Sequence, residues 1–208
     1  MAGVIVVGVL VSGSGTNLQA ILDAVRERTL DARVAVVVSN VADARALDRA
    51  RSAGVETVIV DHKAFADRSA FDAAVVQVLR DRGVELVVLA GFMRLLTPVL
   101  LDAFPMRIVN VHPALLPAFP GIQGQRQALE YGVRLAGCTV HFVDRGTDTG
   151  PIIAQAAVPV LDDDDEATLT ARILEKEHEL LPRVLQWIAE GRVTLQTDSG
   201  ARPRVRIR

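Results

Sequence analysis

Short runs of β-branched and other apolar residues alternate with helical patterns through the first half of this chain, and this alternation limits its possible folds most. The apolar runs cover residues 4–11, 33–40, 56–61, 85–91 and 107–112. They are nearly continuous, which predicts strands buried on both faces of a sheet. Helical spacing of apolar residues covers 17–28, 42–54 and 68–83. Strands that alternate with helices predict right-handed βαβ units and an α/β fold with a mostly parallel sheet.

The second half of the chain has a different pattern. Residues 138–144 and 151–160 are typical of strands, and the short loop RGTDTG between them favours antiparallel pairing. A long helix is expected from about Asp165 to Gly191, with an interruption at Pro182 because proline has no backbone N–H to donate. The segments RVTLQ and RVRIR predict a closing hairpin around DSGARP.

Charge and composition argue against several classes of protein. The net charge is −2, so neither nucleic acid nor an anionic membrane is an expected partner. No apolar run reaches the roughly 18 residues that a membrane helix needs. The single cysteine, Cys138, cannot form an internal disulfide or a cysteine metal site, which fits a reducing cytoplasm. The acidic run 162–166 is interpreted as the start of a helix rather than a metal site.

The motif SGSGTN, which begins at Ser12, joins the first expected strand to the first expected helix. It lacks the lysine of a Walker A loop and the third glycine of a dinucleotide-binding loop. A tight turn at a helix N-terminus presents backbone N–H groups and the positive end of the helix dipole to an anion. Ser12, Ser14, Thr16 and Asn17 add hydroxyl and amide donors for such an anion, although the next basic residue is only Arg26. The motif therefore predicts a site for one phosphate monoester; the alternative is an ordinary turn capped by Thr16 or Asn17.

Asn110 and His112 lie two residues apart in RIVNVHP, so both side chains take the same face of an extended strand. This is the carboxyl end of a strand, where ligand crevices form in open α/β sheets. The later stretch DRGTDTG supplies two aspartates, Asp144 and Asp148. A carboxylate near His112 would stabilise a protonated imidazole. The alternatives are a histidine satisfied within the core and aspartates that only form turns.

Glu177 interrupts the apolar face of the long helix, four residues after Ile173 and four before Leu181. Burying an unpaired charge is costly, so this carboxylate is expected to meet a partner such as the hydroxyls or amine of a ligand. An internal ion pair, or a glutamate at the edge of the apolar face, is the alternative. The other histidines lack the spacing of a metal cluster, and His141 is expected to pack within its strand.

Five motifs occur in order along the chain: SGSGTNLQAIL, SNVADARAL, LAGFMRLLTP, NVHPALLPAFPG and HFVDRGTDTGPIIAQ. Together they closely resemble the phosphoribosylglycinamide formyltransferase family, the folate-dependent glycinamide ribonucleotide transformylases, over about residues 4–190. The resemblance implies a Rossmann-like formyltransferase fold. It also implies transfer of the formyl group of 10-formyltetrahydrofolate to the amine of 5'-phosphoribosylglycinamide. That step of de novo purine (IMP) biosynthesis yields formylglycinamide ribonucleotide and tetrahydrofolate.

The resemblance also implies roles for individual residues. The catalytic residues would be Asn110, His112 and Asp148, with no metal. The ribonucleotide would be bound by Gly15, Thr16, Asn17 and Glu177. The folate would be bound by Arg68, Met93, Arg94, Leu95, Leu96, Asn110, Asp144, Arg145, Gly146, Thr147 and Asp148. One formyltransferase domain is expected over 1–208, with a phosphate-binding half at 1–105, a catalytic and folate-binding half at 106–191 and a C-terminal hairpin at 192–208.

The chain departs from the family at two places near these residues. Ala118 stands where many relatives have lysine, and IQGQRQ replaces a stretch that holds histidines or threonine in relatives. Three other activities are alternatives: a formyltetrahydrofolate hydrolase, formyl transfer to methionyl-tRNA, and a non-catalytic nucleotide-binding module. The SGSGTN turn favours a small phosphorylated acceptor over the first two. Members of the family include dimers, so a homodimer is an expectation.

Overall fold

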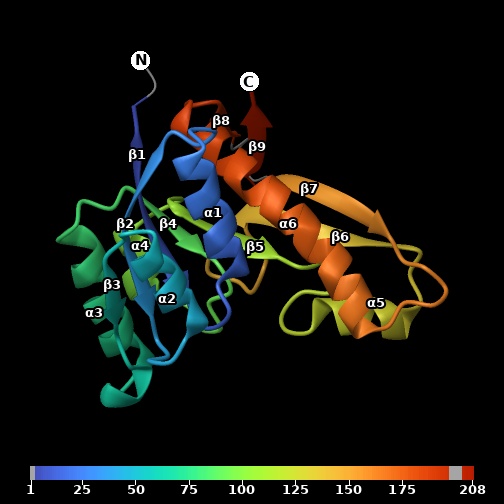
Figure 1. The fold of residues 1–208 in the computed structure, drawn as a ribbon, viewed down its shortest axis with the longest axis horizontal. Coiled ribbons are helices and arrows are strands. Elements are labelled where there is room, and N and C mark those ends of the chain that lie inside the picture. Colours follow the sequence, from blue (N-terminus) through green and yellow to red (C-terminus); the bar gives the residue numbers. More distant parts are fainter. Residues whose placement is uncertain (1–2, 197–202) are drawn as a thin grey trace.

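A seven-stranded sheet lies at the centre of the molecule (Figure 1). The structure is a computed structural model that describes residues 3–196 and 203–208. The strands are β1 (Ile5–Val11), β2 (Ala32–Ser39), β3 (Thr57–Ile59), β4 (Leu86–Leu89), β5 (Ile108–His112), β6 (Leu135–Phe142) and β7 (Ile152–Pro159). Their order is β3-β2-β1-β4-β5-β6-β7. The first five pair in parallel, whereas β6 and β7 are antiparallel to their neighbours. The mostly parallel sheet and its antiparallel addition are therefore confirmed.

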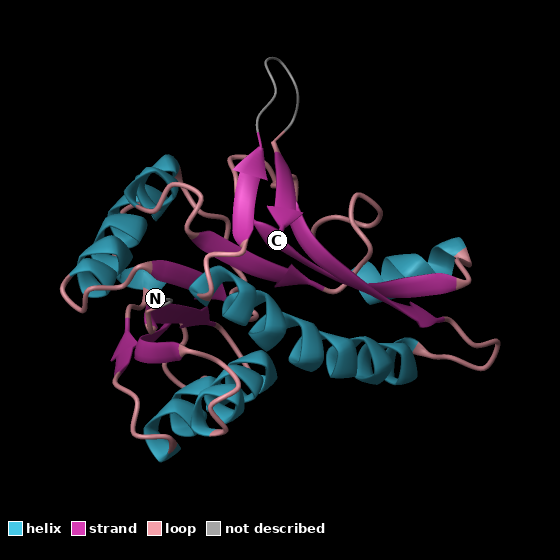
Figure 2. Ribbon diagram, turned by 90° about the horizontal axis from the view of Figure 1, so that it is seen from above, coloured by secondary structure: helices cyan, strands magenta, loops and turns pink. Residues whose placement is uncertain are grey.

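Helices cover both faces of this sheet (Figure 2). They are α1 (Thr16–Arg26), α2 (Arg45–Ser52), α3 (Arg68–Arg80), α4 (Pro98–Ala103), α5 (Gly124–Tyr131) and α6 (Glu166–Ala189), with a 3-10 helix η1 (His62–Ala64). One apolar cluster joins the sheet to α1, α2, α5 and α6, and another joins it to α3 and α4. Neighbouring residues of β1, Val9 and Leu10, belong to different clusters and are both fully buried. Strands without a polar face thus lie between two helical layers.

The strand order reverses at β1, and this reversal places the ligand crevice. The chain first adds β2 and β3 on one side of β1, and β4 then pairs with the other side. Open α/β sheets bind ligands outside the carboxyl ends of the strands at such a point. Here the segments that leave β1 and β4 are in contact, since Ser12 N donates to Gly91 O at 3.1 Å. The turns after β1, β4 and β5 therefore meet at one edge of the sheet.

Two sequence expectations about these elements are wrong. β3 has only three residues and lies at the edge of the sheet, where Ile59 is 44% exposed, so the run 56–61 is not buried on both faces. The helix α6 continues through Pro182 without interruption. Proline removes one backbone hydrogen bond there, but Leu181 and Leu185 on either side of it are fully buried. Their packing against the sheet keeps the helix continuous.

The sequence reasoning missed the short helices α4 and α5, of six and eight residues. The long helix begins where expected, with the side chain of Asp165 capping its first turn. In the expected hairpin, β8 (Val193–Gln196) pairs antiparallel with β9 (Arg204–Ile207), while most of the DSGARP turn, within 197–202, lies outside the described residues. No helix in the described part of the chain is long and apolar enough to cross a membrane.

Candidate active site

The turn after β1 has the backbone geometry of an anion site at the start of α1. Gly15 occupies the N-cap position in a left-handed conformation, with φ of 71°. Within the described residues no side chain caps this terminus, so the first N–H groups of α1 lack an acceptor within the helix. The expected cap by Thr16 or Asn17 is therefore wrong, because Gly15 takes the N-cap position. Free N–H groups and the helix dipole favour an anion here.

Two side chains near this turn differ from the sequence expectation. The Ser12 hydroxyl donates its one proton to Asn40 Oδ1 at 2.6 Å, so it is not a donor for an anion. The sequence placed the next basic residue at Arg26, but the fold brings Arg49 of α2 to the turn, where its Nε donates to Ser14 O at 2.9 Å. A positive charge therefore lies beside the anion site after all, and it comes from a separate helix.

We expect Gly15→Ala to lower the free energy of unfolding by about 1–3 kcal/mol. A Cβ at this position would lie 2.5 Å from Ala46 Cβ and 2.7 Å from Ala46 Cα, and its φ of 71° disfavours alanine. Gly54→Ala is the matched control, because Gly54 has a similar φ of 72° but no atom within 4 Å of the added Cβ. Chemical denaturation would compare the two. Equal losses would mean that close packing against Ala46 contributes nothing.

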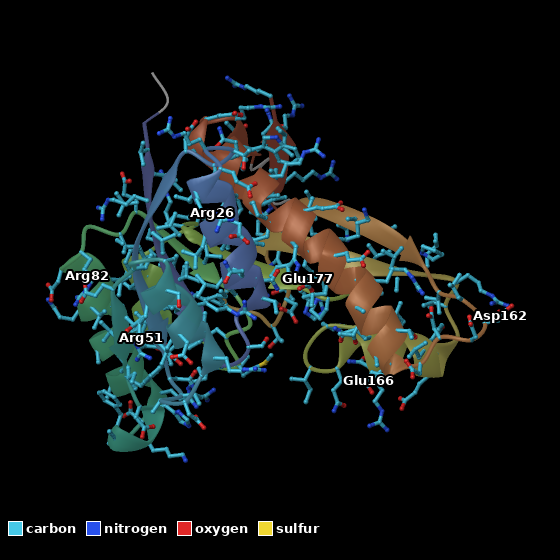
Figure 3. All side chains as sticks on the ribbon, viewed as in Figure 1. Arg26, Arg51, Arg82, Asp162, Glu166 and Glu177 are labelled. Carbon is cyan, nitrogen blue, oxygen red and sulfur yellow. The ribbon has the colours of Figure 1, made fainter. Side chains whose placement is uncertain are left out.

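Asn17 and Glu177 form a buried polar pair between α1 and α6, with Glu177 at the centre of the molecule in Figure 3. Asn17 Nδ2 donates to Glu177 Oε2 at 2.7 Å, and the two residues are 8% and 5% exposed. Burial raises the pKa of Glu177 to about 7, although the hydrogen bond from Asn17 opposes the rise. Asn17 Oδ1 is buried without a hydrogen-bond partner among the described residues. A buried acceptor beside a buried carboxyl group is suited to a ligand that donates hydrogen bonds.

Asn110, His112 and Asp148 come together at the carboxyl end of β5. The buried His112 has its Nδ1 3.4 Å from Asp148 Oδ2 and its Nε2 2.8 Å from Phe119 O. Each ring nitrogen therefore faces an oxygen atom that can accept a hydrogen bond from it. The half-buried Asn110 has its Nδ2 3.3 Å from Nε2 of His141. The three residues that the resemblance implies as catalytic are thus neighbours, and their catalytic role stays a prediction.

His141 is the member of this cluster that sequence reasoning missed. It was expected only to pack within its strand, but its Nε2 lies 3.6 Å from Asp148 Oδ1 and its Nδ1 lies 2.8 Å from Phe142 O. It lies directly opposite Asn110 in the antiparallel ladder between β5 and β6. The only signal in the sequence was the antiparallel pairing itself, whose register the sequence does not reveal.

Asp148 is a carboxylate held between two imidazoles. Burial opposes its ionisation, but hydrogen bonds from His141 and from Gly121 N, together with the charge of His112, outweigh burial and hold the pKa of Asp148 below its usual value. The Gly121 N–H donates to Asp148 Oδ2 at 2.7 Å. The φ of Asp148 is 53°, which lies in the left-handed region that aspartate tolerates better than most residues. Asp148 is therefore ionised at neutral pH and fixed in orientation.

The other aspartate of this loop, Asp144, forms the turn. Its Oδ1 accepts hydrogen bonds from Gly146 N at 3.0 Å and from Thr149 Oγ1 at 2.6 Å. Arg145 Nη2 donates to both carboxylate oxygens of Asp102 in α4, at 3.0 and 3.2 Å. The alternative of a turn-forming aspartate thus describes Asp144 but not Asp148, and the loop is joined to the helix that follows residues 93–96.

The segment 93–96 presents apolar side chains and a cation at the same edge of the sheet. Met93 and Leu95 are 76% and 58% exposed. The Arg94 guanidinium lies 5.2 Å from the centre of the Phe71 ring, and its Nε is buried without a partner among the described residues. Arg68, at the start of α3, is exposed. Exposed apolar side chains with two arginines suit a ligand that has both an apolar ring and acidic groups.

The two departures from the family pattern leave the contacts of the cluster intact. Ala118 is exposed, and α5 begins within IQGQRQ, where Gln127 Nε2 donates to Ile122 O at 2.8 Å. The contacts to His112 and Asp148 come from the backbone of Phe119 and Gly121 and do not require these side chains. In residues 3–196 and 203–208, no group of three or more His, Cys, Asp or Glu side chains could hold a metal ion.

Comparisons with known proteins agree with one another. The formyl transferase family model matches residues 5–185. Phosphoribosylglycinamide formyltransferase of Escherichia coli is 44% identical over 191 residues, which cover 92% of this chain and 90% of that protein. The crystal structure of glycinamide ribonucleotide transformylase 1 from Symbiobacterium toebii is 56% identical and superposes with a TM-score of 0.94, covering 98% of this chain and 94% of that one.

Longer relatives contain a similar region. The trifunctional purine biosynthetic protein adenosine-3 of Drosophila melanogaster is 46% identical over 194 residues, which cover 92% of this chain. The matched region is only 14% of that protein. The chain therefore spans nearly all of the Escherichia coli relative and a small part of the trifunctional one.

Proposed function

The chain belongs to the formyl transferase family, and on that premise we propose that it formylates 5'-phosphoribosylglycinamide with 10-formyltetrahydrofolate in purine biosynthesis. One observation carries the proposal. At the carboxyl edge of a single sheet, a buried His112–Asp148 pair lies with Asn110, and the same edge holds an uncapped helix N-terminus at Gly15. The first set suits acyl transfer, and the second suits an acceptor with one phosphate.

Asn110 and His112 act on the formyl oxygen in this proposal. Negative charge develops on that oxygen as the amine adds to the formyl carbon. The Asn110 amide donates a hydrogen bond to it. The His112 ring donates another when substrate binding exchanges the contact of its Nε2 with Phe119 O for one with the formyl oxygen. One such donor contributes about 3–4 kcal/mol to the lowering of the barrier. Asp148 keeps His112 protonated and oriented, and through a water molecule it relays the proton of the amine to the leaving nitrogen. The folate supplies the formyl group and the leaving nitrogen.

The ribonucleotide binds between α1 and α6. Its phosphate accepts hydrogen bonds from the N–H groups of Gly15, Thr16 and Asn17, and Arg49 adds a positive charge nearby. Glu177 and the unpartnered Asn17 Oδ1 accept hydrogen bonds from the glycinamide end or from ribose hydroxyls. This assignment is supported by the pair's burial and by the orphaned acceptor.

The folate binds across the segment 93–96 and the loop 144–148. Met93 and Leu95 offer apolar surface for its ring system, and Leu96 completes the segment. Arg68 and Arg94 attract the carboxylates of its tail. The proposal is supported by the exposure of the two apolar side chains and by the unpartnered Nε of Arg94.

We also propose a single formyltransferase domain that works in the cytoplasm without a metal, a nucleic acid or a membrane, and that forms a homodimer. The free, buried thiol of Cys138 supports a reducing compartment. Burial and the charge of Glu177 raise the pKa of this thiol to about 12, so it stays protonated and is not a nucleophile at neutral pH. Sedimentation velocity would test the dimer.

The absorbance of the folate gives a direct test. We expect 10-formyltetrahydrofolate to lose its formyl group only when glycinamide ribonucleotide is present. Glycinamide riboside, which lacks the phosphate, is expected to raise KM by about 10²-fold, because charge-assisted hydrogen bonds contribute about 1.5–3 kcal/mol each. Dependence of KM on the phosphate would support the turn at Gly15 as its site.

Other outcomes identify the alternatives. Deformylation without an acceptor would indicate a hydrolase, and deformylation that requires methionyl-tRNA would indicate the tRNA formyltransferase. Folded protein that binds the ribonucleotide but never consumes formyl-folate would indicate a non-catalytic binding module. Each of these results would overturn the proposed function.

A further inference from the structure

One hydroxyl group joins the two segments that the proposed function gives to different substrates. Ser12 Oγ accepts a hydrogen bond from Met93 N at 2.9 Å and donates one to Asn40 Oδ1 at 2.6 Å. Ser12 opens the turn that leads to Gly15, and Met93 opens the segment 93–96. The side chain therefore directly links the turn 12–17, here called the phosphate turn, to the segment 93–96, here called the folate segment. This link lies at the point where the strand order reverses.

A second layer holds this bridge in place. Asn40 is 6% exposed, and its Nδ2 lies 3.3 Å from His62 Nδ1. His62 Nδ1 also lies 3.2 Å from the backbone oxygen of Asn40. The His62 ring packs edge-on against Phe71, with centroids 6.5 Å apart. Phe71 in turn stacks on Phe92, the residue before Met93, at 6.5 Å and 14°. Hydrogen bonds and packed rings thus connect Asn40, which accepts the hydrogen bond from Ser12, to the folate segment.

The far end of the segment has a different anchor. Thr97 N donates to Asp72 Oδ2 at 2.6 Å, and Asp72 is a buried residue of α3. The stretch between Met93 and Thr97 is therefore fastened at both ends. The anchor at Asp72 holds the segment to a helix that takes no part in the phosphate turn. The Ser12 hydroxyl connects the segment itself to the other proposed substrate site, whereas the backbone bond from Ser12 N to Gly91 O joins the two turns two residues before Met93.

We propose that Ser12 is a positioning residue that couples the ribonucleotide site to the folate site. The inference rests on the proposed function. A phosphate that binds the turn fixes Ser12, and Ser12 in turn fixes Met93 and the segment after it. A folate that binds next contacts a segment that is already ordered, so its binding loses less conformational entropy. The coupling is reciprocal, because each ligand must change the affinity of the other by the same factor.

Tetrahydrofolate and glycinamide ribonucleotide are a suitable pair of probes, because without a formyl group they cannot react. Titration calorimetry would measure the Kd of tetrahydrofolate with and without saturating ribonucleotide. In the unchanged chain we expect the ribonucleotide to lower that Kd by about 5-fold or more. In Ser12→Ala we expect the ratio of the two values to fall to about 2 or less, because the hydroxyl link to Met93 is lost while the backbone bond from residue 12 to Gly91 and both sites remain.

Two further variants keep the test decisive. Ser12→Cys keeps the size of the side chain but offers only a weak donor and acceptor, so it should lose the coupling even if the alanine variant does not fold. Asp72→Asn is the matched control, because it weakens the other anchor of the same segment. It should raise the Kd of tetrahydrofolate equally with and without ribonucleotide, leaving the ratio as in the unchanged chain.

The possible results separate this inference from the proposed function. A ratio near 1 in the unchanged chain would overturn the coupling alone, provided that both ligands bind. A ratio in Ser12→Ala or Ser12→Cys that equals that of the unchanged chain would overturn the role of Ser12. An equal loss of the ratio in Asp72→Asn would do the same, since general loosening of the segment would explain it. Failure of both ligands to bind the unchanged chain would overturn the proposed function itself.

Discussion

Replacing His112 with alanine is expected to lower the turnover number of formyl transfer by about 10³-fold or more while leaving the protein folded. The side chain lies between Asp148 Oδ2 and Phe119 O, so its loss removes a donor to the reacting oxygen and an imidazole from beside the carboxylate. KM for the ribonucleotide should change little, because the turn at Gly15 is left unaltered. Initial rates from folate absorbance would measure both constants.

A second substitution separates the charge of His112 from its hydrogen bond. His112→Gln keeps an N–H donor but cannot carry a positive charge, so we expect turnover between that of alanine and that of histidine. Circular dichroism and thermal unfolding would establish that both variants are folded. Near-normal turnover by folded His112→Ala would remove His112 from the mechanism.

The parallel sheet was predictable because its strands carry their signal locally. β1, β2 and β4 are β-branched and mostly buried on both faces, so each shows a continuous apolar run that only a covered sheet can satisfy. The errors arose where neighbours decide the outcome. Pro182 stays within α6 because packed leucines on either side of it hold the helix. β3 lies at the edge of the sheet and pairs with β2 over only three residues, which its own apolar run does not reveal.

Within the site, the sequence revealed pairs that are close along the chain and missed partners that only the fold brings together. Asn110 and His112 were predicted to share a face because they are two residues apart in a strand. His141 joins them through the register of β5 and β6, which no local pattern encodes. Arg49 reaches the phosphate turn only because α2 packs beside α1. Ser12 was expected to donate to a phosphate, but its hydroxyl donates to Oδ1 of Asn40, on the loop after β2.

Replacing Glu177 with glutamine is expected to stabilise the fold at pH 8 by up to about 3 kcal/mol, because each unit of pKa shift corresponds to about 1.4 kcal/mol. Burial raises the pKa of Glu177 from 4.5 to about 7, so the folded chain binds a proton there that the unfolded chain has already lost. The stability of the unchanged chain therefore falls as pH rises from 4.5 to 7, and the full cost is present above pH 7. Urea denaturation at pH 5 and pH 8 would show most of the gain at the higher pH.

Glu179→Gln is the matched control, because Glu179 lies on the same helix, is exposed and pairs with Lys176 at 2.8 Å. Such surface substitutions usually change stability by about 0.5 kcal/mol or less. A gain from Glu177→Gln that was equal at both pH values would contradict a titrating buried carboxyl group.

The same variant should bind glycinamide ribonucleotide about 10-fold or more weakly, because a hydrogen bond to a charged group contributes about 1.5–3 kcal/mol. A carboxylate that lowers the stability of the fold at the pH where it is ionised, and raises the affinity for the acceptor, is better explained by ligand binding than by folding.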